Sequence, residues 1–124
     1  MGSRVLIAED EAHIVESLTF ILSREGHEVT SVADGEAALA KLRSRHPPDL
    51  VILDVMLPRR NGLEVLQAMR ADERLRSLPV LMLTAKAQPH DRTLAEEIGV
   101  DAYVTKPFAN REVIEQVRRL TSPR

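Results

Sequence analysis

The stretch VILDVMLPRRNG, residues 51–62, runs from an apolar segment directly into a single aspartate, Asp54. The chain then breaks at Pro58 and starts again at Asn61-Gly62. A short continuous apolar run is typical of a strand that is covered on both faces of a parallel sheet. The stretch therefore raises a question of chemistry, namely why a lone carboxylate stands at the end of a buried strand.

Three other segments share this continuous apolar pattern, a weaker fifth segment alternates, and helical patterns separate the five. Strands are expected at residues 4–8, 27–32, 49–53, 79–83 and 102–105, of which 27–32 alternates and belongs nearer an edge. Helices are expected at residues 11–25, 34–46, 62–71, 90–98 and from Asn110 onward. Pro47-Pro48 should end the second helix, because the residue before a proline avoids the helical region. This alternation predicts an α/β fold with a doubly wound five-stranded parallel sheet and helices on both faces.

Composition and charge exclude several classes of function. Aromatic residues make up 2% of the chain and the net charge is −2, which argues against stacking platforms for nucleic acid and against a basic surface. The absence of cysteine excludes disulfides and Cys-based metal sites. No apolar run approaches the roughly 20 residues of a membrane span, and we expect no signal peptide. The chain is expected to be one cytoplasmic domain, residues 1–124, with 1–3 a tag or loose start and 121–124 a tail or linker start.

Polar side chains collect where the expected strands end. They are Glu9 and Asp10 after the first strand, Asp54 after the third, Thr84 after the fourth and Lys106 after the fifth. Ligands bind outside the carboxyl ends of the strands in open α/β sheets. Three carboxylates in one place repel one another unless a cation compensates, and hard oxygen ligands suit Mg²⁺. A carboxylate beside Mg²⁺, a lysine and a hydroxyl can form an acyl phosphate, so Asp54 is the candidate phosphoryl acceptor.

Each of these residues also has an ordinary structural interpretation. Glu9 and Asp10 would favour the N-terminus of the following helix through its dipole, and for an acidic pair alone that interpretation is the better one. Asp54 alone would cap a turn, and Lys106 alone would be a solvated surface residue. The functional interpretation rests on their common position, since all of them lie at the carboxyl ends of strands and none at the opposite edge.

The same residues lie in motifs that resemble the receiver domain of bacterial two-component response regulators. The motifs are LIAEDE, DLVILDVMLPRRNGLEVL, PVLMLTAK and GVDAYVTKPF, in this order, and together they cover essentially the whole chain. The resemblance implies a flavodoxin-like sheet with strand order 2-1-3-4-5. It also implies a phosphorylation-gated signalling switch that is not a turnover enzyme on an external substrate.

The resemblance further implies a role for each acidic residue. Asp54 would take a phosphoryl group from a phosphohistidine or a small phosphodonor. Asp10 and Asp54 would bind Mg²⁺, with Mn²⁺ as a substitute, while Glu9 would act through water and Met56 through its backbone carbonyl. We further hypothesise that the side chains of Met56 and Lys86 partly shield the acyl phosphate from water.

The remaining site residues would form the switch. By resemblance, Thr84 would close onto the phosphoryl oxygen and Lys106 would pair with it. Tyr103 would swing inward and remodel the surface of the fourth helix, fifth strand and last helix. The Lys106-Pro107 bond resembles a family position that is usually cis, a form that only X-Pro bonds adopt readily.

The partners implied are a sensor histidine kinase or phosphotransfer protein and an output domain or partner protein, without direct contact to nucleic acid or membrane. The motifs resemble receivers of winged-helix transcription factors, in which Arg92 and Glu112 would pair across a phosphorylation-dependent homodimer, but Ala102 and Gln116 depart from that pattern. The chain is either a stand-alone receiver or the N-terminal receiver of a DNA-binding regulator. Two other classes stay open. One is a Mg²⁺-dependent phosphatase or phosphotransferase with an aspartate nucleophile, which typically needs a second aspartate where Met56 stands, and the other is a non-phosphorylated scaffold.

Overall fold

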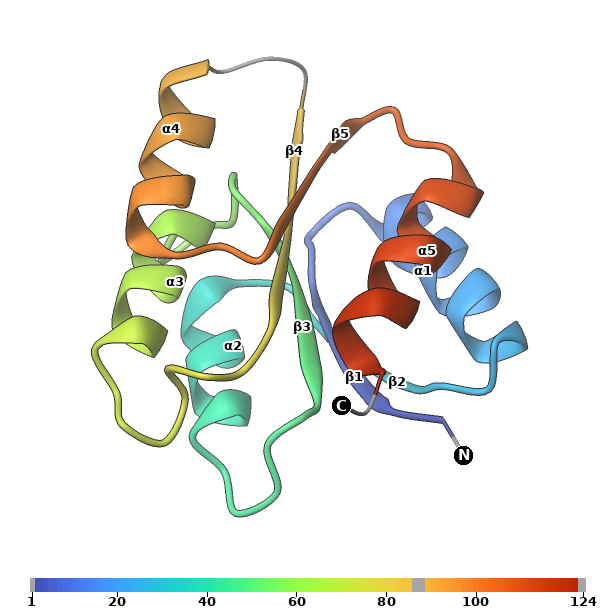
Figure 1. Ribbon diagram of the computed structural model, residues 1–124, viewed down its shortest axis with the longest axis horizontal. Coiled ribbons are helices and arrows are strands. Elements are labelled where there is room, and N and C mark those ends of the chain that lie inside the picture. Colours follow the sequence, from blue (N-terminus) through green and yellow to red (C-terminus); the bar gives the residue numbers. More distant parts are fainter. Residues whose placement is uncertain (1, 86–88, 123–124) are drawn as a thin grey trace.

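The computed structural model describes residues 2–85 and 89–122 of the chain. These residues form one parallel sheet of five strands with helices packed on both faces (Figure 1). The strand order is β2-β1-β3-β4-β5, which confirms both the doubly wound α/β fold and the order that the resemblance implied. The strands are β1 (Arg4–Ala8), β2 (Glu28–Val32), β3 (Leu50–Asp54), β4 (Val80–Ala85) and β5 (Ala102–Lys106).

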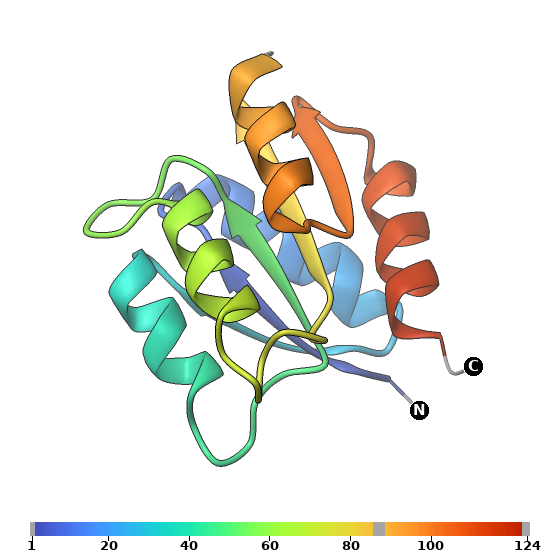
Figure 2. The same cartoon turned by 60° about the vertical axis from the view of Figure 1, so that its left-hand side comes forward.

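Five helices connect and follow the strands within the described residues. They are α1 (Ala12–Arg24), α2 (Gly35–Leu42), α3 (Gly62–Arg70), α4 (Pro89–Ile98) and α5 (Asn110–Thr121). Helices α1 and α5 lie on one face of the sheet, and α2, α3 and α4 lie on the other (Figures 1 and 2). No helix in the described part of the chain is both long and apolar enough to cross a membrane.

Two separate hydrophobic clusters fill the two sides of the sheet. Successive residues of a strand point to opposite faces. Leu6 of β1 therefore packs with the α2–α3–α4 side, whereas its neighbour Ile7 packs with the α1–α5 side. Full burial of such a side chain stabilises the folded chain by about 1.5–3 kcal/mol. The strand that alternated in sequence, β2, pairs only with β1 and is an edge strand, as expected.

Several strands extend further toward their carboxyl ends than the sequence predicted. Asp54, Thr84 and Lys106 were expected just beyond their strands, but each is part of one. The parallel ladder continues through them, since Asp54 pairs with Leu83 and Thr84 pairs with Thr105. Regular sheet pairing thus fixes the backbone of these three candidate site residues, while their side chains remain free to rotate.

Helix α2 ends at Leu42 and not at residue 46 as the sequence predicted. Arg4 reaches across from β1 and donates hydrogen bonds to the backbone carbonyls of His46, at 2.7 Å, and Pro47, at 3.2 Å. The polar backbone of this segment is therefore bound by a side chain from a strand, and the helix ends one turn earlier than the prolines alone require.

Candidate functional site

The carboxyl edge of the sheet brings together the polar residues found in sequence. Glu9 directly follows β1, whereas Asp54, Thr84 and Lys106 lie at or near the ends of β3, β4 and β5. Glu9, Asp54 and Thr84 are buried, with 1%, 2% and 2% of their surface exposed, while Asp10 is exposed. Buried carboxylates are rare unless a cation pairs with them. Two of them at one edge of the sheet therefore indicate a binding site more than a role in folding.

Three carboxylates form a compact acidic group at this edge. One oxygen from each of Glu9, Asp10 and Asp54 lies within 4.8 Å of the other two. Three acidic oxygens at this spacing repel one another, and the repulsion is relieved by a bound cation or by proton uptake.

Lys106 is the ammonium group that compensates this acidic group. Its Nζ atom lies 2.8 Å from Oε1 of Glu9 and 3.5 Å from Oδ2 of Asp54. A third carboxylate, from Glu11, lies 3.2 Å away. The Lys106 side chain is only 13% exposed, so solvent screens these contacts far less than it screens a surface ion pair. The contact with Glu9 is an ion pair whose geometry is not that of a directed hydrogen bond.

The pKa values of Glu9 and Lys106 are both raised, and burial and charge together explain the two shifts. Burial raises the pKa of the Glu9 carboxyl, and the nearby Lys106 ammonium and Glu11 backbone N–H only partly offset that rise. Burial alone would lower the pKa of Lys106, but the surrounding carboxylates of Glu9 and Asp54 outweigh it and raise that pKa. The lysine therefore stays cationic, whereas burial makes the charged form of the Glu9 carboxylate less favourable.

The backbone around Asp54 explains the sequence that follows it. The N–H of Met56 donates a hydrogen bond to Oδ1 of Asp54 at 3.3 Å, which orients the carboxylate. The chain then returns so closely that a Cβ atom at Gly62 would collide with the backbone carbonyl of Asp54. Only glycine fits there, and Asn61 caps the helix that begins at this point by a capping box with Glu64.

The expected switch residues occupy neighbouring strands, β4 and β5. The hydroxyl of Thr84 donates a hydrogen bond to the carbonyl of Ala85 at 3.0 Å. Tyr103 is half-buried against the α2–α3–α4 cluster, and its hydroxyl has no hydrogen-bond partner among the described residues. The guanidinium carbon of Arg92, from α4, lies 5.3 Å from the centre of the Tyr103 ring. Lys86, expected to shield the acyl phosphate, falls outside the described residues.

Other expectations from the resemblance have mixed outcomes in this structure. The Lys106-Pro107 peptide bond is cis, as the resemblance implied. The side chain of Met56 is 69% exposed, so it is free to lie over the site or to meet a partner. Arg92, expected to pair with Glu112 across a dimer, forms an ion pair with Glu96 of its own helix at 3.3 Å in the single chain, and the pair across a dimer stays a prediction.

The donor set at this edge fits a small divalent cation. Carboxylate oxygens are the ligands that Mg²⁺ and Mn²⁺ prefer, and the exposed Asp10 keeps one side of the group open to solvent. The raised pKa of Glu9 indicates that the Lys106 ammonium does not fully compensate the buried negative charge. The acidic group can therefore hold a metal ion in addition to its lysine.

Two contacts at the site were not predicted from the sequence. Glu11 is the third acidic residue of the motif LIAEDE, and its carboxylate contacts Lys106, which lies 95 positions away. Its signal in sequence was the run of three acids directly after a strand, of which only the first two were assigned. Arg92 over Tyr103 had no signal, because a cation above a ring depends on how α4 packs on β5.

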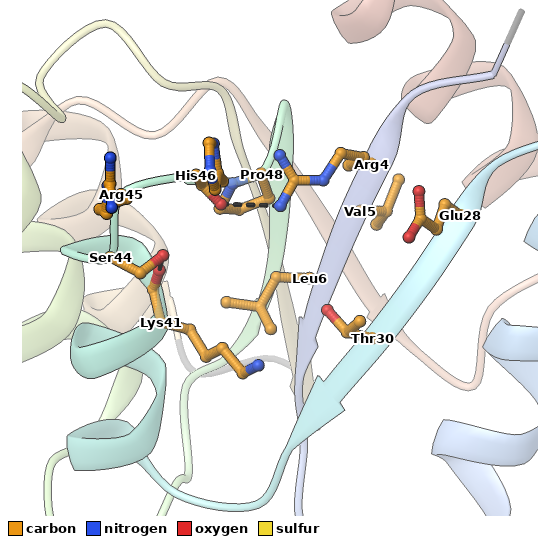
Figure 3. A pocket seen from close by; sticks show the side chains of 10 residues that line it. All are labelled: Arg4, Val5, Leu6, Glu28, Thr30, Lys41, Ser44, Arg45, His46 and Pro48. Carbon is orange, nitrogen blue, oxygen red and sulfur yellow. Dashed lines mark hydrogen bonds between the residues drawn. The ribbon is translucent and has the colours of Figure 1, made fainter.

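Among the hollows on the described surface, one borders this site and another lies apart from it. The first lies between α1 and the segment after β5, and its lining includes Glu11, Ile14, Lys106 and Phe108. The second lies between β1, β2 and the end of α2 (Figure 3), and its lining includes Arg4, Glu28, Thr30, Lys41 and His46. No residue of the acidic group lines this second hollow, so it is separate from the candidate site.

Comparison with known proteins agrees with this geometry. The family model of the response regulator receiver domain matches residues 5–118. The alkaline phosphatase synthesis transcriptional regulatory protein PhoP of Bacillus subtilis (strain 168) is 42% identical over 120 residues, which are 97% of this chain and 49% of PhoP. The chain thus spans about half the length of the curated relatives it matches.

Solved structures give the same result. The signal receiver domain of a signal transduction histidine kinase from Syntrophus aciditrophicus superimposes with a TM-score of 0.89 at 32% identity, covering 97% of this chain and 90% of that chain. The receiver domain of sensor histidine kinase PA1611 from Pseudomonas aeruginosa PAO1, solved with a magnesium ion coordinated in the active site cleft, gives a TM-score of 0.85 at 31% identity and covers 98% of both chains.

The doubly wound sheet and the acidic group with its lysine define a class of phosphorylation-dependent signalling switches. Within that class, the chain belongs to the family of response regulator receiver domains.

Proposed function

We propose that Asp54 is the phosphoacceptor of this receiver domain and that Lys106 and Thr84 assist it. The observation that carries the proposal is the environment of the Asp54 carboxylate. It is 2% exposed at the end of β3, it belongs to the acidic group, and its Oδ2 atom lies 3.5 Å from the Lys106 ammonium. The phosphoryl donor is a phosphohistidine on a sensor histidine kinase or phosphotransfer protein.

The transfer step follows from this arrangement. A carboxylate oxygen of Asp54 attacks phosphorus, and the bond between phosphorus and the imidazole nitrogen breaks with its electron pair returning to nitrogen. The product is an acyl phosphate on Asp54 and a free histidine. Lys106 contributes a fixed positive charge beside the new phosphoryl oxygens. The hydrogen bond from the Met56 N–H holds the carboxylate in place during attack.

Mg²⁺, or Mn²⁺ in its place, is the cofactor that we propose for this step. Asp10 and Asp54 would hold it by their side chains, Glu9 through water, and Met56 by its backbone carbonyl. The bound ion would neutralise negative charge on the phosphoryl oxygens. The magnesium ion in the active site cleft of the PA1611 receiver domain supports this assignment.

Phosphorylation would then be read at the surface of α4, β5 and α5. In this proposal Thr84 turns its hydroxyl toward the phosphoryl group, and Tyr103 moves inward behind it. Such a movement would take the Tyr103 ring away from the Arg92 guanidinium, whose carbon lies 5.3 Å from the ring centre. A homodimer with an Arg92–Glu112 pair would require Arg92 to leave Glu96 and the Tyr103 ring.

The greater length of the curated relatives supports a proposal about the output partner. Because the chain spans about half of a transcriptional regulatory protein such as PhoP, we propose that it acts as the receiver part of a longer cytoplasmic regulator. In such a regulator the nucleic acid would be bound by the other part of the protein. A phosphatase or phosphotransferase with an aspartate nucleophile is disfavoured, since the position two residues after Asp54 holds Met56 and not an acid.

The test is phosphorylation of the isolated chain by acetyl phosphate. With Mg²⁺ present, intact-mass spectrometry should record the gain of one phosphoryl group, and chelation of the metal should abolish it. Asp54→Ala is expected to remove the gain, whereas Asp49→Ala, at an exposed residue directly before β3, is expected to keep it. A folded wild-type protein that gains no phosphoryl group under these conditions would favour the non-phosphorylated scaffold.

A further inference from the structure

Glu11 is the N-cap residue of α1, a position whose side chain ordinarily binds backbone N–H groups of the helix that follows. It is the residue directly before α1, with φ −87° and ψ 112°, and its side chain makes no capping hydrogen bond. The side chains favoured at this position are Ser, Thr, Asp and Asn, because they bind the free N–H groups of the first turn. The Glu11 carboxylate instead reaches Lys106 on β5, with Oε1 at 3.2 Å from Nζ.

Lys106 is therefore shared among three carboxylates in the unphosphorylated domain. The distances from its Nζ atom are 2.8 Å to Glu9, 3.2 Å to Glu11 and 3.5 Å to Asp54. The contact with the proposed phosphoacceptor is the longest of the three. An ammonium group has three N–H donors, and three carboxylates already surround it. A phosphoryl group on Asp54 can therefore take more than one of these donors only by displacing Glu9 or Glu11.

Glu11 differs from the other two carboxylates in a way that matters for this competition. Glu9 and Asp54 are buried and belong to the acidic group, whereas the side chain of Glu11 is 50% exposed and lies outside that group. An exposed carboxylate returns to water at little cost when its partner leaves. Its bond to Lys106 can therefore form and break as the state of Asp54 changes.

We propose that Glu11 is a positioning residue that retains Lys106 in the unphosphorylated domain and thereby opposes phosphorylation of Asp54. The proposal rests on the proposed function of Asp54 and adds a residue that sets how readily that function occurs. An interaction shifts an equilibrium only by the difference in its strength between the two states. The Glu11–Lys106 contact favours the unphosphorylated state, because the phosphoryl oxygens replace Glu11 as a partner of the ammonium.

Two other roles for Glu11 make different predictions. If Glu11 served only the dipole of α1, its loss would change the stability of the helix and leave phosphorylation unaltered. If it acted only as a negative charge that repels an anionic donor, a shorter acidic side chain would act equally well. Glu11→Asp separates these cases, because aspartate keeps the charge but is one methylene shorter than the side chain that now reaches Lys106.

The experiment compares Glu11→Gln and Glu11→Asp with the wild type and with Glu16→Gln. Glu16 is another exposed glutamate, located within α1, so its substitution removes an equal negative charge from the helix that follows Glu11. The initial rate of phosphorylation by acetyl phosphate is followed by intact mass in the presence of Mg²⁺. The NMR signal of the Lys106 ε-methylene group, recorded without phosphodonor, reports its contact with Glu11 independently of any reaction.

Both Glu11 variants are expected to phosphorylate about two- to fivefold faster than the wild type, the effect of losing one partly exposed ion pair. The Lys106 signal should shift in both, and Glu16→Gln should match the wild type in both measurements. Wild-type rates and an unshifted Lys106 signal in Glu11→Gln would overturn the proposal, and so would a wild-type rate in Glu11→Asp. If no protein gains a phosphoryl group, the proposed function itself fails and this inference fails with it.

Discussion

Lys106 illustrates how one side chain makes a crowded acidic edge compatible with folding. Its ammonium group lies within 4 Å of three carboxylates, two of them on buried residues. A buried carboxylate that loses its cationic partner costs several kcal/mol, so the same lysine that would assist the chemistry also holds the site together. Chemistry and stability are coupled at this residue, and a variant of Lys106 would report on both at once.

At the same scale, the pKa of the Tyr103 phenol can be measured directly and reports the burial of this side chain. It is the only tyrosine of the chain, and burial raises the pKa of its phenol above the ordinary 10.0. A group that binds its proton more tightly when folded contributes stability that is fully present below its unfolded pKa and is lost as pH rises through the folded pKa. We therefore expect the folded domain to lose stability above pH 10.0 as this phenol ionises.

The measurement is the tyrosinate absorbance as a function of pH. The midpoint should lie above 10.0 in the native protein and return to the ordinary value in concentrated urea, which serves as the internal control. A native midpoint at or below 10.0 would contradict the burial of this side chain behind Arg92.

At the scale of single elements, the start of α3 determines where the loop after Asp54 ends. The Asn61 side chain accepts a hydrogen bond from the Glu64 N–H at 2.9 Å, and the Glu64 side chain accepts one from the Asn61 N–H at 3.0 Å. Asn61→Ala should lower the free energy of unfolding by about 1 kcal/mol, since the Glu64 N–H loses its side-chain acceptor and the capping box loses one of its two hydrogen bonds. Urea denaturation measures this loss.

The matched control for this prediction is Asn110→Ala at the start of α5. Asn110 is exposed and lies inside its helix, where the preceding cap residue Ala109 makes no side-chain hydrogen bond. The substitution should change the unfolding free energy little. Equal losses for the two variants would mean that the capping box contributes nothing beyond the general propensity of the helix.

Elements also show what the sequence could and could not reveal. Continuous apolar runs predicted four strands and an alternating run predicted the fifth, β2. The carboxyl ends of the continuous runs predicted the edge where Glu9, Asp54 and Lys106 meet. The end of α2 was predicted too late, since the helix ends at Leu42 and Arg4 of the distant strand β1 binds the carbonyls of His46 and Pro47 beyond it. Long side chains that cross between elements leave no periodic pattern, and Glu11 was missed for the same reason.

At the scale of the whole molecule, Arg70 ties together segments that are far apart in sequence. From the end of α3 it donates hydrogen bonds to the carbonyls of Gly99 and Leu78, each at 2.9 Å, and to the carboxylate of Asp101 at 2.9 Å. The same Asp101 oxygen accepts the backbone N–H of Val80. One arginine thus joins α3, the start of β4 and the turn between α4 and β5.

Arg70→Ala should therefore lower the free energy of unfolding by about 2–3 kcal/mol, because several partly buried acceptors lose their donor. Arg111→Ala, which removes an exposed arginine of α5, is the control and should have little effect. Both are measured by urea denaturation, where a shifted midpoint with an unchanged slope indicates a loss of stability without a change of fold. An Arg70→Ala midpoint equal to that of Arg111→Ala would show that these contacts do not support the fold.

The sheet also separates the molecule into two compartments, as the adjacent residues Tyr103 and Val104 show. Val104 is 1% exposed and fills the compartment under α1 and α5, whereas Tyr103 closes the rim of the other compartment and stays half-open to solvent. A reorientation of the Tyr103 ring would therefore repack the compartment under α2, α3 and α4, while Val104 keeps its place under α1 and α5. The two hydrophobic clusters are separate, so substitutions in the cluster that contains Tyr103 can alter the response while the cluster under α1 and α5 keeps the chain folded.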